Sequence, residues 1–142
     1  MKTPVMIWLW YLNVLYWVGF AYLARDEAFW VIMSYFAVGP IIALMIVSQR
    51  GLTRLSGFIH LPWIPLVVYL FVRLFTDTLG PALSPAEDAF YYWWLQVTLW
   101  STAICVAFDV IDVFRWLGGE RYVLGTPAAA AAGASKLAQQ TP

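Results

Sequence analysis

Two aspartates and one histidine are the residues of this chain whose types and spacing could do chemistry in an apolar setting. Asp109 and Asp112 lie three residues apart in a long apolar segment, so a helix would place both carboxylates on one face. His60 begins another apolar segment, and its imidazole titrates near neutral pH. Together these groups could relay protons or hold a cation. The structural alternative is that the aspartates form ion pairs with Arg54 or Arg115 at a helix end.

The two aspartates belong to a longer stripe with spacings of 4, 3, 4, 3 and 4 residues, which keeps its members on one helix face. The members are Thr98, Thr102, Cys105, Asp109, Asp112 and Trp116. Small and polar side chains gain nothing from contact with lipid, so this face should look into the protein or at another protein. Thr98, Thr102 and Cys105 are therefore the predicted helix-packing part of the stripe.

The elements that position these residues must suit a membrane. Of 142 residues, 63% are hydrophobic and only 11% are charged, and the mean hydropathy is +0.74. Soluble domains carry about 25% charged residues, and a chain this short cannot hide so much apolar surface from water. Eight basic residues balance eight acidic ones, so no net field would attract nucleic acid. The sequence therefore predicts an integral membrane protein surrounded by the lipid bilayer, with no nucleic-acid partner.

Four apolar segments, 4–24, 28–48, 55–75 and 85–117, are each long enough to cross a hydrocarbon core of about 30 Å as a helix. Because backbone groups in lipid must satisfy one another, helices are the expected state. The predicted fold class is all-α, with a four-helix transmembrane bundle as one domain over residues 1–124. Residues 125–142 are alanine-rich, and we expect a mobile cytoplasmic tail that is briefly helical after Thr126-Pro127.

Turn and cap residues mark the predicted helix ends. Ser84-Pro85-Ala86-Glu87 reads as a capping box that starts the fourth helix at Pro85, and Gly118-Gly119 would end it. Gly39-Pro40 predicts a kink in the second helix, and Pro62 and Pro65 predict a break in the third. Arg73 and Asp77 are four residues apart, which predicts an ion pair at the far end of the third helix.

The basic residues predict the orientation. Four crossings put Lys2, Arg50, Arg54, Arg115, Arg121 and Lys136 on one side, against Arg25 and Arg73 on the other. Because positively charged loops stay in the cytoplasm, both termini are predicted there, in a multi-pass inner-membrane protein. The first apolar segment is longer than the core of a signal peptide, so we interpret it as an uncleaved helix.

Several classes of site lack the necessary residues. With one cysteine and one histidine, the chain cannot form an intramolecular disulfide, the usual zinc sites or a haem site with two histidine ligands, and no metal or cofactor is predicted. The sequence contains no glycine-rich phosphate loop, nucleophile elbow or paired-histidine motif, so a non-enzymatic role is favoured over an enzymatic one. Its aromatic residues could line a pocket for a quinone, carotenoid or lipid tail, or act as interfacial anchors.

Two segments, RLSGFIHLPWIP at residues 54–65 and FDVIDVFRWLGGER at residues 108–121, resemble the uncharacterised small four-helix inner-membrane proteins of bacteria. The resemblance covers the third and fourth helices, about half of the chain. It implies that His60, Asp109, Asp112 and Arg115 belong to a shared feature on the cytoplasmic side. It implies no activity.

Three functional hypotheses follow. The first is a non-enzymatic protein that works by association, as an accessory subunit of a membrane complex or as a homo-oligomer, with the stripe as its packing face. The second is a small proton- or cation-coupled transporter or channel, built by oligomerisation, with His60, Asp109 and Asp112 at its cytoplasmic mouth. The third is a membrane enzyme acting on a lipid or isoprenoid head group, in which the two carboxylates bind a metal.

Overall fold

The computed structural model describes residues 3–124 and 126–131, and most of them are helical. In chain order the elements are α1 (Thr3–Val18), the 3-10 helix η1 (Gly19–Tyr22), α2 (Asp26–Gln49), the 3-10 helix η2 (Arg54–His60), α3 (Trp63–Phe75) and α4 (Ala89–Leu117). No β-strand occurs among the described residues. The predicted all-α fold class is confirmed.

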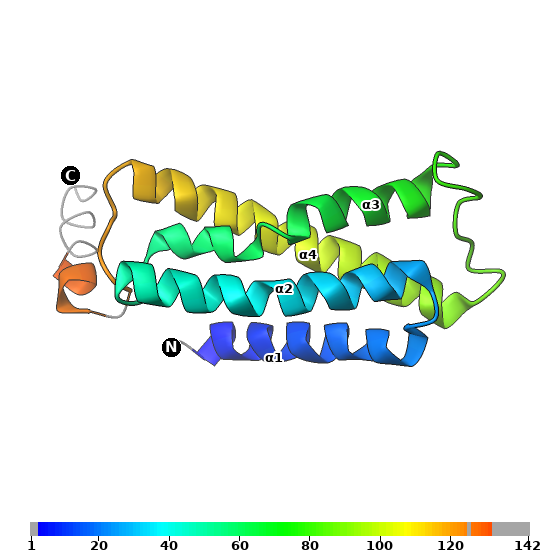
Figure 1. Ribbon diagram of the computed structural model, residues 1–142, viewed down its shortest axis with the longest axis horizontal. Helices are drawn as coiled ribbons and strands as arrows, with labels where there is room; N and C mark the ends of the chain where they lie inside the picture. The colour runs from blue at the N-terminus through cyan, green and yellow to red at the C-terminus, as the bar shows by residue number, and fades with distance from the viewer. Residues whose placement is uncertain (1–2, 125, 132–142) are drawn as a thin grey trace, which may run out of the picture.

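The helices lie side by side along the length of the molecule (Figure 1). The start of α1, the end of α2, the start of η2 and the end of α4 share one end, which we call the Arg54 end. The opposite end, which we call the Arg73 end, holds the end of α3 and the start of α4. Residues 3–22, 26–49 and 89–117 are each long and apolar enough to cross a membrane, and η2 with α3 makes a fourth crossing if the bent pair is one span.

The bend between η2 and α3 measures 45° and lies at the predicted proline positions. Pro62 and Pro65 have no N–H to donate to the carbonyls of Phe58 and Leu61. The Leu61 carbonyl instead accepts from Ile64 N at 3.2 Å, a tighter, 3-10-type bond. The predicted break is confirmed, and the single helix predicted over 55–75 is instead two helices.

The fourth helix begins at Ala89, four residues later than the capping-box pattern predicts. Asp88 is its N-cap and accepts a hydrogen bond from Tyr91 N at 3.0 Å. Ser84 instead closes a local turn by accepting from Ala86 N at 3.2 Å. The prediction of a start at Pro85 is therefore wrong, because the aspartate competes successfully for the role of N-cap.

Other helix ends follow the sequence more closely. α4 ends at Leu117, directly before Gly118-Gly119. At the Gly39-Pro40 position, α2 continues as one helix. Residues 127–131 form a short helical stretch after Thr126-Pro127. The rest of the predicted mobile tail, residue 125 and residues 132–142, lies outside the described residues.

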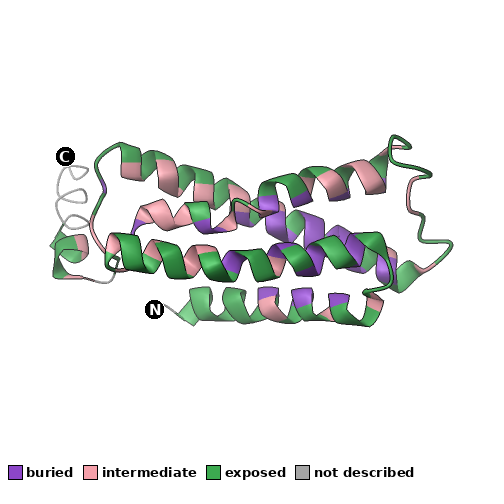
Figure 2. Cartoon of the chain, viewed as in Figure 1, coloured by how far each residue is buried: buried purple, intermediate pink, exposed green. Residues whose placement is uncertain are grey.

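Burial divides the molecule into two halves (Figure 2). In α1 the buried residues begin at Leu12, in α2 they stop at Val38, and in α4 they stop at Cys105. The part of the molecule between these limits and the Arg73 end, together with α3, is the closed half. The remainder, residues 3–11, 39–60 and 106–124, is the open half, where only Thr53, Ile59 and Glu120 are buried.

Candidate functional site

The candidate site begins with the close approach of η2 to α4. Gly57 lies so near α4 that a Cβ atom built on it would be 2.6 Å from the carbonyl oxygen of Asp109. Only glycine fits this contact without a backbone shift. Side chains three residues apart lie on the same side of a 3-10 helix, so the contact at Gly57 also turns His60 toward α4.

His60 and Asp109 form a hydrogen-bonded pair. Nδ1 of His60 lies 2.7 Å from Oδ2 of Asp109, and the two side chains are 25% and 22% exposed. An ionised carboxylate only accepts hydrogen bonds, so Nδ1 is the donor when Asp109 is ionised. No residue among those that the structure describes hydrogen-bonds Nε2. The imidazole also stacks on Trp63, with ring centroids 4.0 Å apart. These contacts fix both the position and the orientation of the ring.

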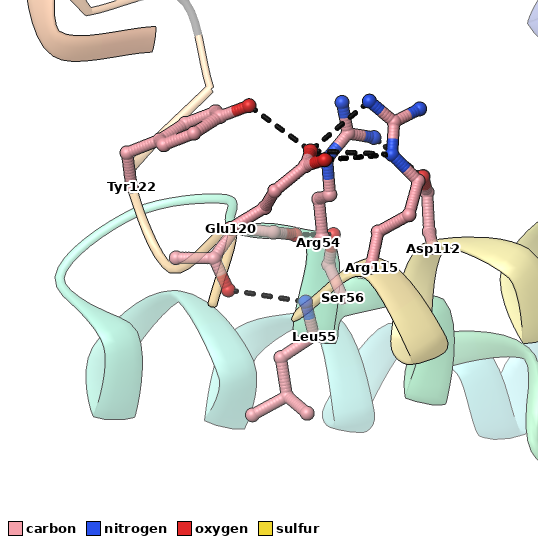
Figure 3. A network of polar contacts seen from close by, with 8 residues as sticks. Arg54, Leu55, Ser56, Asp112, Arg115, Glu120 and Tyr122 are labelled. Atoms are coloured by element: carbon pink, nitrogen blue, oxygen red, sulfur yellow. Dashed lines mark hydrogen bonds and ion pairs between the residues drawn. The ribbon is translucent and has the colours of Figure 1, made fainter. Parts of the chain in front are cut away.

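Asp112 and Arg115 belong to a different group, the Arg54 cluster, which Figure 3 shows. Its members are Arg54, Asp112, Arg115, Glu120 and Tyr122. Arg54 pairs with both Asp112 and Glu120, at 2.6 Å from Nε to Oε2 of Glu120, and Arg115 also binds Glu120. Two cations thus balance two carboxylates, and the cluster holds the end of α4 against the start of η2.

The candidate residues named from the sequence therefore separate into two groups. His60 and Asp109 make one pair, while Arg54, Asp112 and Arg115 join a salt-bridge cluster. Asp109 and Asp112 share a helix face but not a partner. In the part of the chain that the structure describes, no three residues of the types His, Cys, Asp and Glu lie together as a group that could hold a metal ion.

Sequence reasoning missed Glu120 and Tyr122. Glu120 lies beyond Gly118-Gly119, where the helical pattern ends, and Gly119 has a φ of 103° that favours glycine. The turn brings Glu120 back over the helix, and its backbone N–H donates to the Arg115 carbonyl at 3.1 Å. An acidic residue directly after a Gly-Gly helix end was the available signal, because it faces the basic last turn.

The small residues of the α4 stripe face inward, as the spacing predicts. Thr98 and Thr102 are 0% exposed and Cys105 is 7% exposed. Their neighbours come largely from α1 of the same chain: the Tyr16 hydroxyl lies 2.9 Å from Thr102 Oγ1, and Trp8 Nε1 donates to Cys105 Sγ at 3.3 Å. The stripe is thus used within this chain, which corrects the expectation that it serves as the packing face toward a partner.

A cavity of about 620 Å³ lies beside the His60–Asp109 pair, between α1, the middle of α2, η2 and α4. Its polar wall includes His60, Asp109 and Asp112, and its aromatic wall includes Tyr16 and Trp63. Tyr16 stacks on Trp63 with centroids 5.2 Å apart, on the side of the core. The cavity therefore places a histidine–carboxylate pair near aromatic side chains, of which Tyr16 and Trp63 are buried and Trp8, Phe36 and Phe108 are exposed.

A second polar group at the Arg73 end was not anticipated. We call it the Glu27 cluster: Glu27, Arg73 and Tyr91. Arg73 Nε lies 2.7 Å from Glu27 Oε1, and the Tyr91 hydroxyl donates to Glu27 Oε2 at 3.0 Å. Asp77, the predicted partner of Arg73, instead accepts from Ala82 N at 2.9 Å. The predicted pair is wrong, because the buried carboxylate of Glu27 needs a cation more than the loop residue Asp77 does.

Comparisons with protein-family models, with curated proteins and with solved structures found no match to this chain. The resemblance of residues 54–65 and 108–121 to small inner-membrane proteins stays a prediction from the sequence. The structure adds that these two segments contact each other, through Gly57 against Asp109 and through Arg54 with Asp112.

Proposed function

We propose that this chain is a multi-pass inner-membrane protein, folded as a four-helix bundle, that works by lateral association with other membrane helices rather than by catalysis. It would act as an accessory subunit of a membrane complex or as a homo-oligomer. The observation that carries this proposal is an apolar groove between α2 and α3.

The groove has a volume of about 480 Å³ and lies where the chain bends at Pro62. It is lined by Trp30, Met33, Ser34, Ala37, Pro62, Pro65, Leu66 and Tyr69. Lipid tails are as apolar as the groove, so shape and close backbone approach decide helix association in a membrane. Ser34 and Ala37 on α2 are small enough to permit that approach, and the two prolines leave a hollow opposite them.

The packed residues between the two polar clusters favour a role in association over transport of ions through a single copy of the chain. Leu70, Leu95 and Leu99 are 0–1% exposed and lie in the core between α3 and α4. These leucines make the packing apolar in this part of the core, which favours association over a pore within one chain.

The charges of the described residues support an orientation with both termini in the cytoplasm. The Arg54 end carries Arg50, Arg54, Arg115 and Arg121, whereas the Arg73 end carries Arg25 and Arg73. Arg25 and Arg73 each pair with a carboxylate, of Asp88 and Glu27 respectively. The excess of basic residues at the Arg54 end is what the positive-inside rule associates with the cytoplasm.

Site-directed cross-linking tests the association. In a Cys105→Ser background, Ala37→Cys places a thiol in the groove, and Val47→Cys, which lies on the same helix and is 78% exposed, is the matched control. A membrane-permeant thiol cross-linker should join Ala37→Cys to a second copy or to a partner subunit and leave Val47→Cys monomeric. Recovery of both variants as lone monomers in mild detergent would contradict the proposal.

A second candidate function is proton-coupled transport, favoured by the His60–Asp109 pair on the wall of a cavity. Histidine and carboxylate side chains are the groups that relay protons in membrane transport proteins. Proteoliposomes under a pH gradient provide the test. Wild type should carry protons, His60→Ala and Asp109→Asn should lose the flux, and the loop variant Asp77→Asn should keep it; absence of flux from wild type would exclude this candidate.

A further inference from the structure

We propose that the cavity beside His60 is a binding site for a ring-headed membrane lipid. Such a molecule has a flat ring with carbonyl or hydroxyl oxygens, as in a quinone, and an apolar tail that extends into the bilayer. The site is independent of the proposed association, because the cavity and the α2–α3 groove share no lining residue.

The size and shape of the cavity suit such a ligand. Small-molecule sites in proteins occupy about 300–1,000 Å³, and this cavity measures about 620 Å³. Its lining residues extend along α1 from Val5 to Tyr16, a distance of about 16 Å at the rise of an α-helix. The cavity is therefore elongated along the helices, with room for a ring and the first part of a tail.

His60 supplies the hydrogen bond for the ring oxygen. Its Nδ1 is held by Asp109, and no residue in the described part of the chain hydrogen-bonds its Nε2. That nitrogen accepts from a hydroxyl when the imidazole is neutral and donates to a carbonyl when it is protonated. A small number of positioned polar groups in a largely apolar site is the usual arrangement for orienting an apolar ligand, and here Asn13, Asp109 and Asp112 join His60 in the lining.

The aromatic wall is already stacked without a ligand. The ring of Trp63 stacks with both His60 and Tyr16, with interplanar angles of 15° and 17° respectively. Trp63 is 4% exposed, and its Nε1 has no hydrogen-bond partner among the described residues. A flat ring beside His60 would lie against the more exposed aromatic side chains of the lining, Trp8, Phe36 and Phe108.

The rim of the cavity favours a lipid over a water-soluble molecule. Phe36 is 55% exposed, Phe108 is 66% exposed, and both line the cavity, so its opening is apolar. Asp109 lies eight residues before the end of α4, about 12 Å along the helix. An apolar tail could leave through this rim while the ring stays at His60.

The charges on the cavity wall favour a neutral ring over a phospholipid head group as the ligand. The polar wall carries the carboxylates of Asp109 and Asp112, and the arginine near them, Arg54, is already paired with Asp112 and Glu120. A phosphate would therefore meet negative charge without a free cation from this cluster, whereas a quinone or quinol ring carries no charge.

Alkylation of Cys105, the single cysteine of the chain, reports on occupancy because this residue lines the cavity. The full chain in lipid nanodiscs is treated with N-ethylmaleimide with and without decylubiquinone, and the rate is followed by mass spectrometry. At ten times the dissociation constant, decylubiquinone should slow alkylation about tenfold by mass action. Dodecanol, which has a tail but no ring, should give no protection.

Two variants identify the ring site. His60→Phe keeps a stacking ring but removes the hydrogen bond, and protection should be lost. Gly39→Phe should also abolish it by filling the cavity, since a Cβ at this lining position meets no atom within 4 Å. Phe71→Ala, at a 48% exposed position outside the cavity, is the control and should bind normally.

The proposal is overturned if decylubiquinone leaves the alkylation rate of wild type unchanged, if dodecanol protects equally, or if His60→Phe is protected like wild type. If His60→Phe does not fold, as judged by circular dichroism, the result with Gly39→Phe decides. None of these outcomes depends on whether the α2–α3 groove binds a partner.

Discussion

The two halves of the molecule use similar residues in different ways. Each half holds a polar cluster that joins the third segment of the chain to another helix: Glu27 with Arg73 in the closed half, and Arg54 with Asp112 and Glu120 in the open half. In the closed half the carboxylate side chain is 6% exposed and sits among packed helices. In the open half the side chain of Asp112 is 39% exposed at the edge of a cavity.

This difference indicates that the two halves have different roles. The closed half contains almost all of the buried residues and serves as the scaffold, whereas the cavity beside His60 lies where the closed half meets the open half. Ligand-binding regions are drawn from the less tightly packed parts of proteins, because a binding site needs room and some freedom to adjust. The substitutions below test whether the halves differ energetically as their packing indicates.

The largest contrast should come from the two carboxylates. Glu27→Ala leaves the half-buried guanidinium of Arg73 with the carbonyls of Leu79 and Pro81, and it removes the acceptor of the buried Tyr91 hydroxyl. We expect a loss of about 3 kcal/mol in the free energy of unfolding. Asp112→Ala removes a partly exposed partner, for which about 1 kcal/mol is expected. Unfolding in mixed micelles measures both. Equal losses would show that the clusters are equivalent, and the double variant Glu27→Leu with Arg73→Leu should recover much of the stability.

A smaller contrast is expected from leucines in the two halves. Leu95 is 0% exposed in the core of the closed half, so Leu95→Ala should leave a cavity and cost about 2 kcal/mol, the lower end of the usual range because lipid removes part of the hydrophobic contribution. Leu44 on α2 is 64% exposed, and Leu44→Ala should change stability by less than about 0.5 kcal/mol. The same unfolding assay would contradict the division if Leu44→Ala were the more damaging change.

Two glycines of the open half differ in the space around them: Gly57 is closely packed against α4, whereas Gly39 faces open space. Gly57→Ala forces a methyl group against the Asp109 carbonyl and should cost about 1–2 kcal/mol. It should also separate His60 from Asp109, which the NMR signals of the single imidazole of this chain would report.

Gly39→Ala is the matched control for this effect. Its new methyl group meets no atom within 4 Å, and alanine favours a helix more than glycine does. We expect unchanged imidazole signals and a stability equal to or slightly above that of wild type. A change at His60 in this variant would mean that α2 and η2 are coupled through contacts other than packing.

A small effect is also expected from the surface of the closed half. Arg25 pairs with Asp88 at 2.9 Å, but their side chains are 43% and 27% exposed. Arg25→Gln should therefore cost less than about 1 kcal/mol, and the loss should shrink further in high salt. A loss comparable to that of Glu27→Ala would show that position in the closed half, rather than burial, determines the strength of a pair.

The candidate site was partly predictable. Spacing alone placed the stripe of α4 inward, and depth along the helices allowed His60 to meet Asp109, as the structure shows. The partners of Arg73 and Arg54 were not predictable in full, since Glu27 and Glu120 lie 46 and 66 residues away from them in the chain. Local rules pair neighbours on one helix, whereas burial of Glu27 selects a partner from another helix.

The sequence by itself determined that this chain is helical and apolar enough to enter a membrane, because composition and hydrogen bonding in lipid act on each segment separately. The tertiary structure decided that the bend at Pro62 and the contact of Gly57 with α4 leave a groove on one side and a cavity on the other. A cavity is the space that several packed helices fail to fill, so it depends on how far each helix can approach its neighbours, which no single segment specifies.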